Sequence, residues 1–131
     1  MNSSQKYERI AKCMDLWMQN REEGKNIAHY LKSKRINRIG VYGYGILGRH
    51  LVFELKAAGI ENVWIADRRE CIDQKFYTFV NFAEEDHIPE TELIIVTAIG
   101  NMEEIEGVLR NRVNCPIVSL EEIIGEMKYL K

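Results

Sequence analysis

The chain has 131 residues, of which 46% are hydrophobic, and its 18 basic and 20 acidic residues give a formal net charge of −2. This length suits a single domain with its own core and leaves no room for a second domain of similar size. Because the charges are well mixed, the sequence offers neither a basic surface for nucleic acid nor an acidic tail, and we expect no DNA or RNA partner.

Two features predict the compartment. No apolar run approaches the roughly 20 residues that span a bilayer, and the start MNSSQKYERIAKCM lacks the apolar segment of a signal peptide. Cys13, Cys71 and Cys115 are odd in number and widely spaced, without a C-x-x-C pair. We therefore expect reduced, largely buried thiols, no metal site, no membrane association and a cytoplasmic location.

Two helices are predicted before the first strand. Apolar residues of the first, over residues 3–20, recur at helical spacing: Tyr7, Ile10, Met14, Trp17 and Met18. Gly24 is expected to end this helix, and residues 26–35 repeat the pattern briefly. We interpret residues 1–36 as a helical extension packed on a domain of residues 37–131.

Strand and helix patterns then alternate. Apolar runs predict five strands, at residues 38–42, 62–67, 76–80, 93–98 and 115–120. Helices are predicted at residues 45–59, 102–113 and 120–131, the first with Leu47, Leu51 and Leu55 on one face and Gly59 as its stop. The alternation implies an α/β fold, a Rossmann-like doubly wound parallel sheet of about five strands in the order 3-2-1-4-5.

Two capping-box patterns support the last two helices. Asn101 is followed three residues later by Glu104, and Ser119 by Glu122. In such a box, the first side chain accepts a hydrogen bond from the helix start and the second returns one. We expect each helix to begin directly after its capping residue.

The stretch VYGYGILGRH, residues 41–50, is the main functional signal. It places Gly43, Gly45 and Gly48 at the spacing G-x-G-x-x-G, after a predicted strand and at the start of a predicted helix. Gly43 would permit the sharp turn, Gly45 would let a pyrophosphate approach the backbone, and Gly48 would let helix and sheet pack closely. This context predicts a site for a nucleotide phosphate; the alternative is a turn retained for packing that binds nothing.

The helix start adds to this candidate site. N–H groups from Ile46 to Arg49 are expected to face the phosphates at the positive end of the helix dipole. Tyr44 and Leu47 belong to the same turn and are included as binding residues. His50, one turn inside the helix, could touch a phosphate, but a surface histidine is the better interpretation.

Asp67 ends the second predicted strand, about 20 residues beyond the turn, the spacing at which a carboxylate reaches a ribose diol. Such a carboxylate repels a 2′-phosphate, which favours NAD or another unphosphorylated ribose over NADP. Arg68 and Arg69 could pair with a phosphate or stack on a base, or stand solvated at a helix start.

The loop after the fourth predicted strand, TAIGN, should face the same crevice. Thr97, Gly100 and Asn101 are its candidate binding residues, although the cap would suffice to explain Asn101. His29, His50 and His87 are scattered, and residues 84–86 form an acidic cluster best interpreted as a solvated loop. No triad or metal site is predicted, and the catalytic residues are unknown.

From Arg38 onward, the glycine turn, Asp67 and the IIVT strand resemble the small Rossmann-like nucleotide-binding modules of bacterial surface-polysaccharide and glycosylation systems, found alone or fused to glycosyltransferases. They are also similar to the nucleotide-sugar-binding domain of bacterial sugar acyltransferases and to the nucleotide-binding domain preceding polysaccharide dehydratases and epimerases. The resemblance implies that Gly43, Gly45, Gly48 and Asp67 contact a nucleotide, a nucleotide-sugar or NAD. The helical extension and the lack of an acyltransferase repeat or a catalytic domain depart from the pattern of these proteins.

Three functions follow from these patterns. The first is a cytoplasmic module that holds a nucleotide-sugar or dinucleotide for a partner such as a glycosyltransferase, without catalysis of its own. The second is a minimal NAD-dependent oxidoreductase or its cofactor subunit, although the sequence has no Tyr-x-x-x-Lys after the fourth predicted strand and no well-placed histidine or lysine. The third is a ligand-free interaction domain with the Trp17 helix as a dimer surface. Under each of the three functions, the chain could also form a homo-oligomer.

Overall fold

The computed structural model describes residues 1–68, 77–82 and 87–130. Its helices are α1 (Ser3–Glu22), α2 (Ile27–Ser33), α3 (Ile46–Ala57), α4 (Met102–Leu109) and α5 (Leu120–Lys128). Its strands are β1 (Arg38–Tyr42), β2 (Asn62–Ala66), β3 (Thr78–Phe79), β4 (Leu93–Val96) and β5 (Ile117–Ser119). Each predicted element that falls in the described chain is present, with ends that differ by a few residues.

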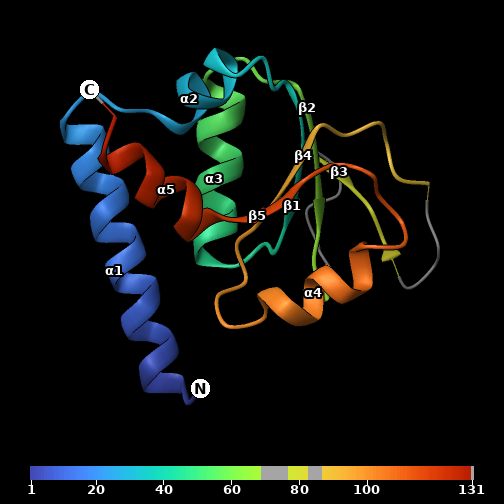
Figure 1. The fold of residues 1–131 in the computed structure, drawn as a ribbon, viewed down its shortest axis with the longest axis horizontal. Helices are drawn as coiled ribbons and strands as arrows, with labels where there is room; N and C mark the ends of the chain where they lie inside the picture. Colours follow the sequence, from blue (N-terminus) through green and yellow to red (C-terminus); the bar gives the residue numbers. More distant parts are fainter. Residues whose placement is uncertain (69–76, 83–86, 131) are drawn as a thin grey trace.

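The five strands form one parallel sheet in the order β3-β2-β1-β4-β5, as predicted. Helices cover both faces: α4 lies on one side of the sheet, and α1, α3 and α5 lie on the other (Figure 1). The chain runs outward from β1 to β2 and β3, then crosses back to place β4 and β5 on the other side of β1, so β1 and β4 are the strands where the order reverses. The carboxyl ends of β1 and β4 border this switch point, where open α/β sheets bind ligands.

Alternation along the strands builds two apolar layers. Ile39 and Val41 of β1 join one cluster with α1, α2, α3 and α5, whereas Tyr42 joins the second cluster with α4. Gly40 also faces the second layer, where an added Cβ would lie 2.2 Å from the Trp64 ring of β2. The glycine in the middle of β1 therefore makes room for an indole, which the sequence pattern alone does not reveal.

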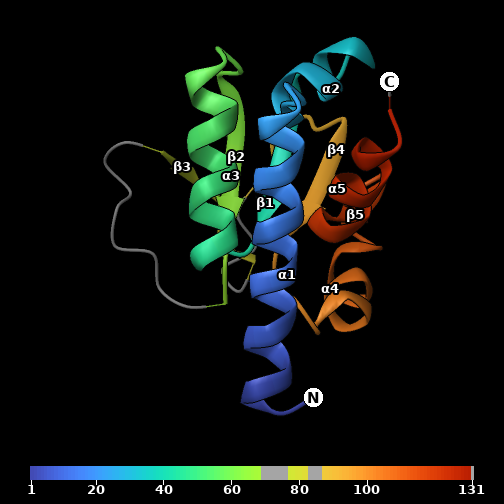
Figure 2. The same ribbon diagram turned by 90° about the vertical axis from the view of Figure 1, so that its left-hand side faces the viewer.

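The N-terminal helices are part of the larger apolar cluster. Figure 2 shows α1 running between α3 and α5 in that view, and Cys13 and Trp17 of α1 are buried in this cluster. The predicted apolar face of α1 is partly wrong, because Tyr7 is 63% exposed and Met18 is 50% exposed. The true buried face is Cys13, Trp17 and Asn20, and the Asn20 side chain donates a hydrogen bond to the Ile124 carbonyl of α5. Trp17 itself is thus a core residue, while Tyr7 and Met18 of the same helix are exposed.

A buried carboxylate joins α1, α2 and α3. Glu54 of α3 accepts hydrogen bonds from the Trp17 indole (3.3 Å) and from the Ile27 backbone N–H (3.2 Å). The Arg21 guanidinium lies 3.6 Å from the same carboxylate. Burial raises the pKa of Glu54 above its usual value, against the opposing effects of the Trp17 hydrogen bond and the Arg21 charge. The sequence analysis did not single out this residue.

The helix ends follow the predictions except at α4. Glycines with positive φ follow α1 and α3, at Gly24 (φ +79°) and Gly59 (φ +87°), and stop both helices as expected. Ser119 caps α5 by accepting from the Glu122 N–H, which is one of the two bonds of the predicted box, whereas the Asn101 side chain makes no cap hydrogen bond to α4, so the box predicted there is wrong. A full capping box instead starts α1, between Asn2 and Gln5.

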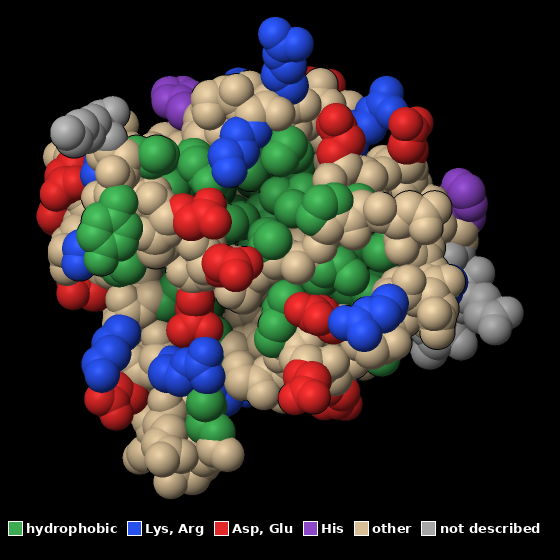
Figure 3. All heavy atoms as spheres, in the orientation of Figure 1, with side chains coloured by type: hydrophobic (Ala, Val, Ile, Leu, Met, Phe, Trp, Pro, Cys, Tyr) green, Lys and Arg blue, Asp and Glu red, His purple; other side chains and the backbone are tan. Residues whose placement is uncertain are grey.

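The surface carries mixed charges. On the face drawn in Figure 3, acidic and basic side chains surround a central apolar area and form no extended patch of one sign. No helix in the described chain is long and apolar enough to cross a membrane. Cys13 and Cys115 are free, with Cys13 buried and Cys115 half-buried, and Cys71 lies outside the described residues. Burial raises the pKa of Cys13 to about 12, which makes this thiol unreactive.

Candidate functional site

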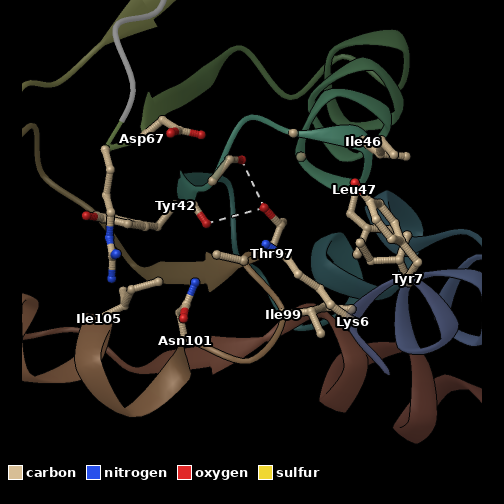
Figure 4. Close-up of a pocket in the computed structure, with 16 residues that line it drawn as sticks. Lys6, Tyr7, Tyr42, Ile46, Leu47, Asp67, Thr97, Ile99, Asn101 and Ile105 are labelled. Atoms are coloured by element: carbon tan, nitrogen blue, oxygen red, sulfur yellow. Dashed lines mark hydrogen bonds between the residues drawn. The ribbon is translucent and has the colours of Figure 1, made fainter. Parts of the chain in front are cut away.

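A cavity of about 380 Å³ lies at the carboxyl ends of β1, β2 and β4. Ligand pockets commonly fall between about 300 and 1,000 Å³. Figure 4 shows Asp67 and Tyr42 at one end of the cavity and Ile46, Leu47 and Tyr7 at the other, with Thr97 between them. The described chain thus has a ligand-sized hollow at the predicted switch point.

The glycine turn forms the floor of this cavity, and two of its glycines are required by packing. Gly43 has a φ of +114°, and a Cβ there would lie 2.5 Å from the Thr97 hydroxyl oxygen. At Gly48 a Cβ would lie 1.9 Å from the Gly43 carbonyl oxygen. Because that oxygen belongs to the backbone, no change of side-chain rotamer can move it away. The two glycines are therefore sufficiently explained by the close approach of α3 to the end of β1.

Thr97 holds the turn from the neighbouring strand. Its hydroxyl donates to the Gly43 carbonyl (2.9 Å), and its backbone N–H donates to the Tyr42 carbonyl (2.9 Å). The side chain is buried, with 6% of its surface exposed. Thr97 therefore fixes the turn against β4, so its place in the cavity lining is explained by structure before any ligand is considered.

Gly45 and the start of α3 supply the groups that suit an anion. Gly45 is the N-cap of α3 and contributes no side-chain cap, so the N–H groups of Ile46, Leu47 and Gly48 precede the first intrahelical bond. The Arg49 N–H was expected among them, but it donates to the Gly45 carbonyl at 3.0 Å. Gly45 has a φ of −88°, which other residues adopt, so its conformation does not by itself require glycine.

Asp67 has a partner within the turn. One of its carboxylate oxygens accepts a hydrogen bond from the Tyr44 backbone N–H at 2.5 Å, while the side chain also lines the cavity. The carboxylate therefore orders the turn, a role that the sequence analysis did not foresee. A carboxylate has about four acceptor positions, so this bond leaves capacity for hydroxyl donors.

The mouth of the cavity carries an ion pair. Arg68 lies 2.6 Å from Glu104 of α4, and 52% and 62% of the two side chains are exposed. Tyr42 lines the same cavity as Arg68, and burial raises the pKa of its hydroxyl above the usual value. Arg68 thus already has a carboxylate partner, whereas Arg69 lies outside the described residues.

Eight of the ten predicted binding residues line the cavity together: Gly43, Gly45, Ile46, Leu47, Gly48, Asp67, Arg68 and Thr97. Tyr44 lies outside this lining, and its ring packs edge-on against Phe79 and Tyr77, at centroid distances of 5.6 and 6.3 Å. Gly100 lines a neighbouring hollow of about 250 Å³. Asn101, which does not cap α4, lines the main cavity.

The remaining polar candidates lie elsewhere. His50 is exposed, and its ring meets that of Trp17 edge-on at a centroid distance of 6.5 Å, as expected for a surface histidine. The acidic cluster at residues 84–86 lies outside the described part of the chain. Among the described residues, no group of histidines, cysteines and carboxylates could hold a metal ion.

Sequence reasoning missed the contribution of the N-terminal helix. Lys6, Tyr7 and Ile10 of α1 line the cavity, together with Ile99 and Ile105. Their distance from the glycine turn in sequence hid them, and exposed positions on an amphipathic helix give no local signal of a site. The helical extension is thus a wall of the candidate site as well as a packing element.

Comparison of this chain with family models, curated proteins and solved structures finds no match. The resemblance to nucleotide-binding modules of polysaccharide systems therefore stays a prediction. The functional argument depends on the cavity itself.

Proposed function

We propose that this chain is a nucleotide-binding module whose cavity holds the diphosphate part of a nucleotide-sugar or an NAD-type dinucleotide. The observation that carries the proposal is the open cavity above the start of α3, where N–H groups at Ile46, Leu47 and Gly48 have no intrahelical acceptor. A helix N-terminus bordering such a hollow favours a negatively charged ligand. Delivery of the ligand to a glycan-assembling enzyme is the part of the proposal that comes from the sequence resemblance.

The lining suits a nucleoside diphosphate in chemistry and size. Asp67 provides a carboxylate for ribose hydroxyls, and the apolar side chains of Ile46, Leu47 and Ile99 provide a surface for a flat ring. At about 380 Å³ the cavity is near the small end of the usual range for ligand pockets, so the second half of a dinucleotide would extend past its mouth. The part of the ligand outside the cavity, which carries the reacting group, would then be contacted by a separate protein surface.

A thermal-shift screen tests this proposal. The probes are NAD, NADP, coenzyme A and the uridine, guanosine and cytidine diphosphate sugars. A ligand at 100 times its dissociation constant stabilises the folded state by about 2.7 kcal/mol, which corresponds to a rise in Tm of roughly 10 °C for a chain of this size. A diphosphate-bearing ligand is expected to give such a rise, and a flat response to all probes would reject the proposal.

Gly45→Val is expected to reduce the affinity for the diphosphate ligand by at least about tenfold, since its side chain would stand where phosphate oxygens approach the α3 N–H groups. The φ of −88° at Gly45 avoids positive-φ strain, so the circular-dichroism spectrum should change little. Isothermal titration measures the affinity. Gly107→Ala is the control, since Gly107 is exposed on α4 with nothing within 4 Å of an added Cβ. Wild-type affinity in Gly45→Val would place the phosphates elsewhere.

Asp67→Ala is expected to weaken a ribose-bearing ligand by about one to two orders of magnitude, because hydrogen bonds to a charged acceptor contribute roughly 1.5–3 kcal/mol. NADP should gain relative to NAD, since the repelling carboxylate is gone. Asp67→Asn separates the two roles of the residue: its amide oxygen can still accept from the Tyr44 N–H, while the charge is lost. If parallel titrations with NAD and NADP show the wild-type preference in both variants, Asp67 acts on the turn alone.

A further inference from the structure

Lys6 is a cation on the cavity wall without a partner in the described chain. Every other described lysine is engaged: Lys12, Lys25 and Lys34 by carboxylates, Lys32 and Lys56 by backbone carbonyls, and Lys128 by the Tyr129 ring. The Lys6 side chain is drawn extending inward from α1, toward Thr97 (Figure 4). Within the described residues, the Lys6 ammonium therefore has no partner that neutralises its charge.

The helix that carries Lys6 opposes its positive charge. Lys6 lies near the N-terminus of α1, and the first turn of that helix contains no acidic residue. A cation near a helix N-terminus is opposed by the helix dipole. The start of α3 brings its positive helix end to the cavity that Lys6 lines. The start of α3 and the Lys6 ammonium thus line this end of the cavity together, and both favour a negatively charged group.

The first turns of α1 are held in place although they bury little. Residues 1–8 are exposed, yet the capping box between Asn2 and Gln5 closes the helix start. One turn beyond Lys6, Arg9 forms an ion pair with Glu121 of α5 at 2.6 Å. Lys6 therefore lies on a fixed helical segment, between an anchored turn and a capped end.

We propose that Lys6 binds the phosphate groups of the ligand and that α1 thereby forms one wall of a phosphate subsite opposite the glycine turn. The inference rests on the proposed function and adds a binding residue to it. The ammonium of Lys6 donates to non-bridging phosphate oxygens, while the α3 N–H groups donate from the other side. An arginine can replace this charge, whereas a neutral side chain cannot.

The test compares Lys6→Ala, Lys6→Arg and the control Lys12→Ala by isothermal titration. Lys12 lies on the same helix but pairs with Glu8 and does not line the cavity. The probes are ADP, UDP and inorganic pyrophosphate, with adenosine and uridine as phosphate-free counterparts. Lys6→Ala should weaken the phosphate-bearing probes by about tenfold or more, leave the nucleosides unchanged and reduce the salt dependence of binding. Lys6→Arg should retain most of the affinity, and Lys12→Ala should match wild type.

The alternative outcomes separate this inference from the proposed function. If Lys6→Ala binds ADP and UDP as wild type does while Gly45→Val does not, the site stands and Lys6 is not part of it. If Lys6→Ala and Lys12→Ala weaken the binding of these probes equally, the loss of affinity comes from the change in net charge, and the role of Lys6 is also overturned. If the wild-type protein binds no phosphate-bearing probe, the proposed function fails and the Lys6 inference fails with it.

Discussion

Gly48→Ala is expected to lower the free energy of unfolding by about 3 kcal/mol or more, at the upper end of the usual cost of overpacking. The added Cβ would lie 1.9 Å from the Gly43 carbonyl oxygen and 2.8 Å from the Gly43 carbonyl carbon. Both atoms are backbone, and Thr97 holds that carbonyl in place by a hydrogen bond of 2.9 Å. To accept the methyl group, α3 must move away from the end of β1. Urea denaturation followed by circular dichroism measures the loss.

Gly107→Ala is the matched control, because it makes the same substitution inside a helix where nothing lies within 4 Å of the added Cβ. Alanine is a better helix former than glycine, so this variant should be more stable than wild type by roughly 0.5–1 kcal/mol. The two substitutions should thus have opposite signs. If Gly48→Ala were as stable as wild type, α3 would not depend on a close approach to the turn.

Glu54→Leu is expected to lower the free energy of unfolding by roughly 2–5 kcal/mol. The change removes the acceptor of two buried donors, the Trp17 indole N–H and the Ile27 backbone N–H, and each unpaired donor costs about 1–3 kcal/mol. Glu54→Gln should cost less, because its amide oxygen still accepts one of the two bonds. A double-mutant cycle with Trp17→Phe isolates the indole contribution. Additive losses in that cycle would show that the two side chains are not coupled.

The same residue gives the protein a defined pH dependence. Because burial raises the pKa of Glu54, the folded state keeps this proton to a higher pH than the unfolded state does. The stability that protonated Glu54 contributes is fully present below the ordinary carboxyl pKa and is lost as the pH rises through the raised pKa. Glutamine has no such proton, so the stability advantage of wild type over Glu54→Gln should narrow with rising pH. Urea denaturation of both proteins across that pH range measures the difference between their free energies of unfolding. If this difference widens with rising pH, the Trp17 hydrogen bond and the Arg21 charge outweigh the effect of burial on Glu54.

Local sequence features determined the fold class. Strands β1, β2, β4 and β5 are short apolar runs, and α3 has leucines at helical spacing between a glycine turn and Gly59. These signals lie within single segments, and the right-handed crossover rule converts their order into a sheet order. The glycine spacing and Asp67 likewise located the cavity, because the carboxyl ends of neighbouring parallel strands meet at one edge of the sheet.

The tertiary structure decided what each side chain does there. Gly43 and Gly48 are required by close contacts with Thr97 and with each other. Asp67 accepts a hydrogen bond from the Tyr44 N–H. Glu54 accepts hydrogen bonds from Trp17 and Ile27. Each of these contacts joins residues whose pairing depends on how elements pack, which periodicity within one element does not encode. The position of Lys6 is the clearest case: the sequence places it on a helix, but the packing of α1 against α5 and α3 is what brings its charge to the glycine turn.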